Sequence, residues 1–396
     1  MSDFDIVLAG GGLVGAATAI GLARSGHRVG LLEASSRQAN HQPSYDDRTL
    51  VINLASLNIL SGLDLLPETL PRVPVREIRI TRAGGFGMLR LKASEHRRDY
   101  FGAVIVAREL GNVMLEAVAS QAGLTELCPA TLETFTVEPD HVRLRLGDGR
   151  QLRTRLLVGS DGTGSMVRQI AAVPSQHHDY GQSAMIFNVR PGHAARDTAW
   201  ERFTPQGPLA LLPQPEDRLG VVWIDRTEAI DAAMAWDDDT LIRRLDQRFG
   251  ASLGGFSQPG KRARYRLVRQ RTPWPIAERV VLIGNAANSV HPVSAQGFNL
   301  GLRDAASLIE CLQDQADPGA GAVLETYARS RQADQEATVR YTDTLARAFT
   351  NPALLARFGA GFGLAAHAAV PALSRRLVQA AMGFRDPVTR LARGNG

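Results

Sequence analysis

Cysteine is nearly absent from this chain, which has only Cys128 and Cys311 among its 396 residues. Neither belongs to a CxxC pair or to a cluster of cysteine and histidine. This scarcity argues against a disulfide framework and a structural zinc site, and it predicts a reducing compartment. We therefore expect no metal site and a cytoplasmic protein.

Three further features are missing. The chain has no run of 18 or more apolar residues, so we expect no segment that spans a bilayer. The N-terminus MSDFDIVLAG has acids and no basic region, unlike a signal peptide. No block of consecutive basic residues accompanies the net charge of +5. The positive charge is equally consistent with two interpretations. One is an anionic partner such as a nucleotide, a lipid headgroup or a nucleic acid, and the other is a basic surface without a specific partner.

What the chain does have is a glycine turn close to its N-terminus. An apolar run over residues 4–9 is short enough for a buried parallel strand. The glycines that follow, Gly10, Gly12 and Gly15, fit the pattern GxGxxG. A helix rich in small residues and a second strand complete the unit over 14–34. This order predicts a dinucleotide site.

Each part of the unit has a physical reason. The first glycine allows a tight turn, the second lets backbone approach a pyrophosphate, and the third permits contact between helix and strand. The N–H groups and the partial positive charge at the helix N-terminus suit the pyrophosphate. Glu33, 18 positions after Gly15, is placed to accept hydrogen bonds from an adenosine ribose. A turn used only for packing is the alternative, and the motif does not separate NAD from FAD.

Two more strand-and-turn elements lie downstream. The stretch RLLVGSDGTGSMVRQIA places Asp161 and Gly162 after an apolar strand. The stretch VVLIGNAANSVHPVSAQGFNLGLRD places Gly284 and Asn285 at the end of another strand, before a loop with little side-chain bulk and a helical pattern. Such a loop lets backbone approach a flat or charged ligand. A turn filled with small residues for packing is the alternative.

With these three elements in this order, the sequence resembles the single-component FAD-dependent aromatic hydroxylases typified by para-hydroxybenzoate hydroxylase. That family has GxGxxG, then DGxxSxxR, then a G-D pair before a P-x-x-G-x-G/N-N loop. Here the match runs from Gly10 to Asn299, about 300 residues. Within the family, the sequence looks most like the ubiquinone-biosynthesis hydroxylases that act on prenylated methoxyphenols. Asn285 replaces the common aspartate and accepts a weaker hydrogen bond, which lowers the expected affinity for FAD.

The resemblance implies an α/β fold: a Rossmann-like FAD-binding domain, an interleaved substrate domain on a mixed β-sheet, and C-terminal helices. The expected ranges are 1–74, 106–179 and 276–342 for the FAD-binding domain, 75–105 and 180–275 for the substrate domain, and 343–396 for the C-terminal segment. Strand-like alternation and turn signals recur in the substrate ranges. The C-terminal segment is apolar but broken by glycine and proline, so it either lies on a membrane or packs against the protein.

The resemblance also implies the residues of the site. The expected cofactor-binding residues are Gly10, Gly12, Gly15, Glu33, Arg48, Arg108, Asp161, Gly162, Gly284, Asn285, Gly297, Phe298 and Asn299. Arg48 is also expected to be catalytic, because its fixed charge near the ring favours reduced FAD. Pro292 is expected along the flavin ring and is counted among the catalytic residues, as is His291. His291 beside it either assists the deprotonation of a phenol or makes a structural hydrogen bond.

The implied activity is that of a monooxygenase, which uses FAD, NAD(P)H and O2 to hydroxylate the ring of a prenylated phenol in ubiquinone biosynthesis. The protein is expected in the cytoplasm. Because its substrate resides in the bilayer, it is either free there or held at the inner face of the membrane or in a ubiquinone-synthesis complex. No nucleic acid partner is implied. The alternatives are a related hydroxylase of another ring position or of a soluble phenol, a flavin-dependent reductase of isoprenoid lipids, and a non-catalytic FAD-binding subunit.

Overall fold

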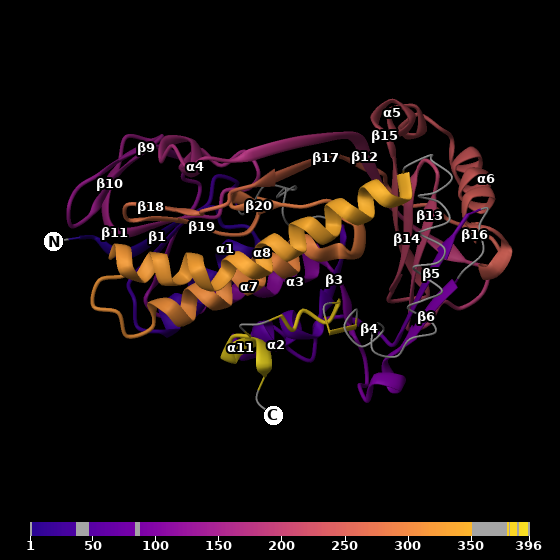
Figure 1. The fold of residues 1–396 in the computed structure, drawn as a ribbon, viewed down its shortest axis with the longest axis horizontal. Coiled ribbons are helices and arrows are strands. Elements are labelled where there is room, and N and C mark those ends of the chain that lie inside the picture. Colours follow the sequence, from indigo (N-terminus) through magenta and orange to yellow (C-terminus); the bar gives the residue numbers. More distant parts are fainter. Residues whose placement is uncertain are drawn as a thin grey trace.

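The structure is a computed structural model that describes residues 2–36, 47–83, 88–350, 378–379, 381–385 and 388–394. Figure 1 shows two sheet-containing bodies side by side, with the helices α7 (Gln296–Leu312) and α8 (Gly321–Thr350) lying along the first and α8 reaching toward the second. Strands and helices alternate along the first body. The predicted α/β class is confirmed.

The first sheet is the Rossmann-like part of the fold. Its strands run in the order β18-β19-β11-β1-β2-β8, and β10 and β9 extend it from β11. The four pairs that join β19, β11, β1, β2 and β8 are parallel. The bounds are β1 Phe4–Ala9, β2 Val29–Leu32, β8 Leu124–Leu127, β9 Leu132–Val137, β10 Val142–Leu146, β11 Gln151–Gly159, β18 Ile276–Ala277 and β19 Val280–Leu282. Both strands predicted around the N-terminal glycine turn are present.

Helix α1 (Leu13–Arg24) is buried along most of its length, against the first sheet and α7. Its glycines and alanines bring these elements close together: a Cβ on Gly21 would lie only 2.3 Å from Cδ1 of Ile309. The other helices of this body are α2 Leu54–Gly62, α3 Ala107–Ser120, α4 Met166–Ile170 and α11 Arg390–Arg393. Because this core packs tightly, the N-terminus of α1 has a fixed position.

The second sheet has two apolar faces with different roles. Its order is β20-β17-β12-β15-β14-β13-β5-β6, and β16 pairs with β12. One face packs on α5 (Thr227–Met234) and α6 (Asp238–Phe249), with Trp200, Leu211 and Trp223 in the core between them. The other face lines the cavity described below. The bounds are β5 Glu77–Arg82, β6 Met88–Lys92, β12 Gln176–Pro191, β13 Thr198–Thr204, β14 Gly207–Gln214, β15 Arg218–Arg226, β16 Phe256–Ser257, β17 Ala263–Arg271 and β20 Asn288–Ser289.

A third, antiparallel sheet joins the two bodies. It consists of β3 (Thr49–Asn53), β7 (Gly102–Val106) and β4 (Val73–Val75), in that order. Strands β5 and β6 leave it between β4 and β7 and enter the second sheet. The chain therefore crosses to the second sheet and back at this small sheet.

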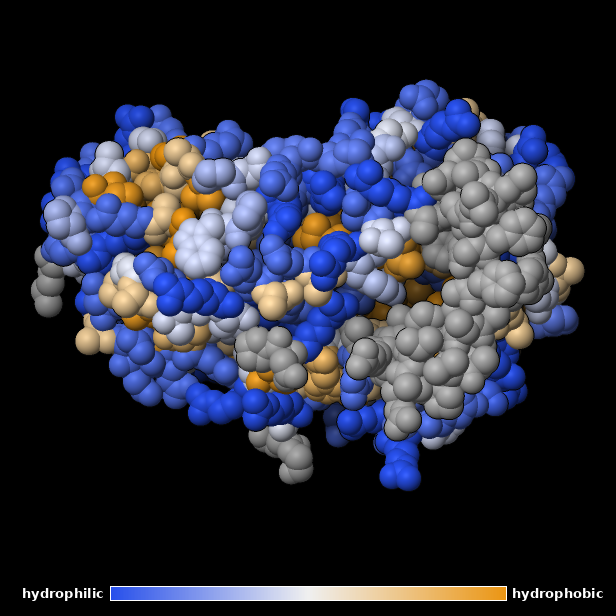
Figure 2. Space-filling view, in the orientation of Figure 1, coloured by the Kyte–Doolittle hydropathy of each residue, from blue (hydrophilic) through white to orange (hydrophobic). Residues whose placement is uncertain are grey.

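The C-terminal segment that the sequence analysis assigned to a membrane or packing role begins inside α8. Residues 351–377 lie outside the described residues, so that role stays a prediction. In the part of the chain that the structure describes, no helix combines the length and the apolar character needed to cross a membrane. Figure 2 shows that the described face crossed by α8 is largely hydrophilic, with hydrophobic side chains in small groups.

Candidate active site

A cavity of about 1100 Å³ is lined by residues of all three sheets and of α1, α7 and α8. One end is formed by the turns that follow parallel strands of the first sheet, and these residues are Gly10, Gly12, Gly15, Glu33, Ser160, Asp161, Gly162, Gly284 and Asn285. The other end is the apolar face of the second sheet. Small-molecule sites usually occupy about 300–1,000 Å³, so this cavity has room for a dinucleotide and a second molecule.

The N-terminal glycine turn fits a ligand because side chains are excluded from it. Gly10 has φ +106°, and a Cβ there would lie 2.5 Å from the carbonyl oxygen of Ser160. A Cβ on Gly15 would lie 2.0 Å from the carbonyl oxygen of Gly10. Gly12 is the N-cap of α1 and has no side chain that could cap the helix. The first N–H groups of α1 are therefore suited to an anion in the cavity.

Two carboxylates stand at the ends of the strands that flank β1 on either side, β2 and β11. Glu33 follows β2, and its oxygens accept hydrogen bonds from the backbone N–H groups of Gly11 at 3.0 Å and Ser35 at 2.7 Å. Asp161 follows β11 and accepts a bond from Ser165 Oγ at 2.6 Å and one from the N–H of Met166 at 2.7 Å. Both line the cavity, and the carboxylate of Asp161 also holds its own turn together.

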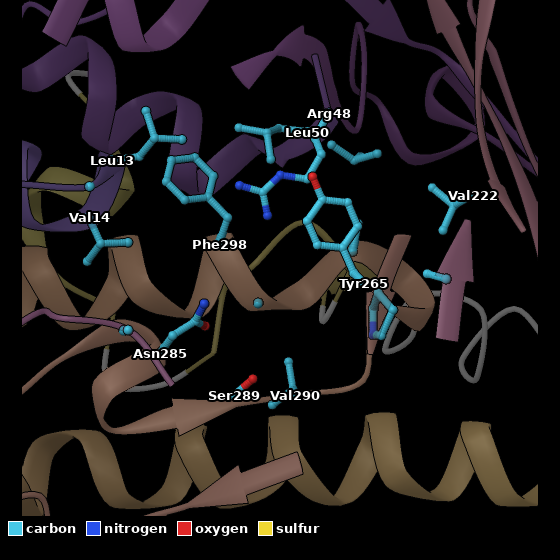
Figure 3. A pocket seen from close by; sticks show the side chains of 18 of the residues that line it. Leu13, Val14, Arg48, Leu50, Val222, Tyr265, Asn285, Ser289, Val290 and Phe298 are labelled. Atoms are coloured by element: carbon cyan, nitrogen blue, oxygen red, sulfur yellow. The ribbon is translucent and has the colours of Figure 1, made fainter. Parts of the chain in front are cut away.

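The third turn comes from the segment around residue 290. Gly284 and Asn285 follow β19 and line the cavity, as do Pro292, Gly297 and Phe298. Figure 3 shows Phe298, Leu50, Arg48 and Tyr265 around the same space, with Asn285 on another side of it. These residues come from segments more than 200 positions apart, and the fold brings them to one place.

Arg48, which the sequence analysis expected near the flavin ring, lines the cavity in the region between its two ends, called the middle region below. Its guanidinium carbon lies 5.1 Å from the centroid of the Tyr265 ring. A guanidinium over an aromatic face is attracted by the ring quadrupole, so this contact orients Arg48 along the cavity wall. Tyr265 was not identified from the sequence, where it is one residue in an alternating strand.

Asn299 does not line the cavity, although the sequence analysis placed it against the cofactor. Its side chain is buried and donates to the carbonyls of Val51 at 2.8 Å and Ala295 at 2.7 Å. Its oxygen accepts a bond from the N–H of Asn53 at 2.9 Å. Ser294 and Ala295 both have left-handed backbone, which costs energy for residues with a side chain. Asn299 therefore holds the strained turn and ties it to β3.

Arg108 and His291 also lie away from the cavity wall. The Arg108 guanidinium is 53% exposed and pairs with Asp47 and Glu109. His291 is buried, and its Nδ1 accepts a bond from the N–H of Val293 at 3.2 Å. Burial lowers the pKa of His291 to about 4, so the ring is neutral at pH 7. Of its two predicted roles, the geometry favours the structural hydrogen bond.

A buried ion network supports the third turn from behind. Arg331 on α8 donates to Asp304 at 2.8 Å and to Asp334 at 2.7 Å, and Arg303 on α7 donates to Asp334 at 2.7 Å. All four side chains are at most 5% exposed. Burial alone would raise the pKa of Asp334, but the two arginines hold it far below its usual range. The other oxygen of Asp304 accepts the N–H of Gly284 at 3.3 Å, which links the network to the cavity.

The apolar end of the cavity contains one carboxyl group that the sequence analysis missed. Glu201 on β13 pairs in register with Ile80 on β5 and with Ala210 on β14, and Ala210 pairs with Val222. All four residues line the cavity. Burial raises the pKa of Glu201 to about 7. The sequence did contain a signal for this residue. In the alternating pattern of β13, Glu201 stands in phase with Ala199 and Phe203, which line the same cavity.

Replacing this residue, Glu201→Gln, is expected to stabilise the substrate-free protein by about 2–3 kcal/mol above pH 7. The unfolded chain loses this proton near its ordinary pKa of 4.5, whereas the folded protein keeps it until about pH 7. The stability of the unsubstituted protein therefore falls over that interval, and the gain on substitution disappears toward pH 4. Urea denaturation at a series of pH values measures this; a gain that does not vary with pH would contradict it.

The described residues fit FAD. The turns after β19, β11, β1 and β2 follow parallel neighbours and all line one cavity, which is the usual place for a dinucleotide. The glycine turn leaves no space for side chains, an uncapped helix begins there, and Glu33 stands at the end of β2. The expected cofactor-binding residues that line this cavity at its turns are Gly10, Gly12, Gly15, Glu33, Asp161, Gly162, Gly284, Asn285, Gly297 and Phe298.

Several known proteins are similar to this chain in sequence or in fold. Ubiquinone hydroxylase UbiL of Rhodospirillum rubrum is 34% identical over 389 residues, which cover 96% of this chain and 89% of UbiL. The 3-demethoxyubiquinol 3-hydroxylase of Escherichia coli is 29% identical over 389 residues, 96% of this chain and 98% of that enzyme. The crystal structure of p-nitrophenol 4-monooxygenase PnpA from Pseudomonas putida has a TM-score of 0.79 at 19% identity and covers 96% of this chain and 98% of its own. This last likeness concerns the fold.

The FAD-binding fold, together with sequence relatives that are hydroxylases, defines this chain as a FAD-dependent monooxygenase. Residues 3–342 match the FAD binding domain family, and the chain belongs to that family. The family resemblance and the FAD cofactor predicted from the sequence are thereby confirmed.

Proposed function

We propose that this protein hydroxylates the aromatic ring of a prenylated phenol, a precursor of ubiquinone, with NAD(P)H and O2 as co-substrates. The observation that carries the proposal is the continuity of one cavity from the glycine turns of the first sheet to the apolar face of the second. The names of the two sequence relatives, a ubiquinone hydroxylase and a 3-demethoxyubiquinol 3-hydroxylase, support the substrate class.

A bound FAD would supply the chemistry of the reaction: two electrons from NAD(P)H and the activation of O2, with one oxygen atom entering the ring and the other released as water. The chain supplies binding, orientation and exclusion of water. The glycine turn and the N-terminus of α1 bind the pyrophosphate. Arg48 places a fixed positive charge in the middle region, where it stabilises negative charge on a reduced ring system.

The apolar end of the cavity, called the chamber below, orients the phenol. Its wall includes Ala199, Phe203, Ala210, Val222 and Ile224, all from the cavity face of the second sheet. Such a wall suits a substituted aromatic ring with an isoprenoid chain, because both gain from leaving water. It also keeps water from the reacting atoms, which strengthens every electrostatic contact inside.

The decisive experiment is the mass of the product. Purified, FAD-loaded protein is incubated with NAD(P)H, O2 and 2-methoxy-6-prenylphenol, a short-chain probe. We expect a product heavier by one oxygen atom and oxidation of NAD(P)H that depends on the phenol. Saturation of a double bond in the prenyl group would indicate a reductase instead. Bound FAD without phenol-stimulated NAD(P)H oxidation would indicate a non-catalytic subunit.

A further inference from the structure

We infer that Glu201 binds a ring hydroxyl of the substrate, so that the chamber selects aromatic rings that carry a free hydroxyl next to the apolar wall. The inference rests on the proposed function, because it assumes that an aromatic molecule enters the chamber. It adds the group that recognises this molecule.

The position of Glu201 sets it apart from the other acids of the second sheet. It stands in a row that runs across five strands on the cavity face, formed by Ile80, Glu201, Ala210, Val222 and Ile186. Every member of the row lines the cavity, and Glu201 is its one charged residue. Side chains on a pleated sheet alternate between faces, so the carboxyl group cannot turn to the opposite, fully packed face.

The carboxyl group also has no counter-ion. Other acids of this sheet are paired: Glu77 with Arg79 and Arg90, and Asp225 with Arg248. Among the described residues, no ion pair or hydrogen bond is formed by the Glu201 side chain. An acid that is partly buried in an apolar wall without a partner destabilises a protein, because its lost hydration is not replaced. A ligand that donates a hydrogen bond would supply the missing partner.

Among the described residues, Tyr341 of α8 lines the same chamber as Glu201. Burial and the negative charge of Glu201 both raise the pKa of the Tyr341 hydroxyl. Tyr265 of β17 and Arg48, which is stacked on that tyrosine, line the same cavity. A cationic ligand would need several acceptors around it, whereas the part of the chamber that the structure describes offers one carboxyl group in an apolar wall. A phenol matches this, because it is apolar apart from one donor.

The test compares a phenol with its methyl ether, which cannot donate. The FAD-loaded, full-length protein is titrated with 2-methoxy-6-prenylphenol and with its O-methyl ether, and binding is followed by the change in flavin absorbance. We expect the protein to bind the phenol about tenfold more tightly or better. The preference should grow as the pH rises through about 7, since an ionised carboxylate is the stronger acceptor.

The variant Glu201→Gln should reduce the preference to about twofold and remove its pH dependence, while its FAD content stays unchanged. Asp239→Asn, which removes an exposed charge on α6 at the other face of the same sheet, is the matched control and should keep the original preference. A preference that survives Glu201→Gln, or is absent from the unsubstituted protein, overturns the inference. If the preference is found but no hydroxylated product forms, the proposed function fails and the inference stands; if product forms but Glu201→Gln keeps the preference, the inference alone fails.

Discussion

Replacing Arg331 by methionine is expected to lower the free energy of unfolding by about 3–5 kcal/mol. Arg331 is 2% exposed and donates to two buried carboxylates, Asp304 and Asp334. Methionine fills much of the same volume but leaves both aspartates with less compensation, one of them next to Arg303 and the other at the cavity turn. The loss comes mainly from the carboxylates left behind, because an unpaired buried charge is far costlier than a missing contact.

Denaturant titration of the variant and the unsubstituted protein measures this loss. The matched control is Arg329→Met, two residues away on the same helix, where the side chain is 72% exposed and pairs with Glu325. Exposed pairs of this kind contribute little, so the control should leave the unfolding midpoint nearly unchanged. Equal effects from the two substitutions would show that the network does not stabilise the fold as argued.

Replacing Gly15 by alanine is expected to weaken FAD binding by about ten- to a hundredfold. The new Cβ would lie 2.0 Å from the carbonyl oxygen of Gly10 and 2.7 Å from Oγ of Ser160. Cβ atoms in proteins essentially never approach other atoms below 3.0 Å, so either α1 or the turn must move. Either movement displaces the N–H groups that are placed to bind the pyrophosphate.

The FAD content of the purified variant and a titration with added FAD measure the effect. Gly164→Ala provides the control, because a Cβ at Gly164 meets no atom within 4 Å although the residue lies in the neighbouring turn. This control should bind FAD as the unsubstituted protein does. Retention of normal FAD content by Gly15→Ala would mean that the glycine turn serves packing alone.

The parts of the site that could be predicted from the sequence are those set by backbone. Gly10, Gly12 and Gly15 stand where the turn excludes side chains, and a pattern of glycines after an apolar run reports such a constraint directly. The later turns at Asp161 and Gly284 were found because the resemblance supplied their order. All of these turns line one cavity.

The directions of side chains could not be predicted in the same way. His291 and Asn299 flank residues at the cavity, but one accepts a backbone N–H and the other holds a strained turn. Glu201 and Arg331 were missed for the opposite reason. A charged residue in a strand or a helix is usually solvated. Only the packing of α7 on α8 buries Arg331, and only the pairing of β13 within the second sheet places Glu201 in the lining of the cavity.

Strand β13 has a further consequence for how this protein can change over evolution. Trp200 packs in the core against α5 and α6 and also contributes to the cavity lining, while its neighbours Ala199 and Glu201 border the chamber and are not part of that core. A shift of the β13 register by one residue would exchange these positions. It would place the carboxyl group of Glu201 in the apolar core and the indole of Trp200 in the chamber. Insertions or deletions in this strand would therefore disrupt both the apolar core and the chamber. New ring preferences should arise by single replacements within the row across the sheet, with strand lengths left as they are.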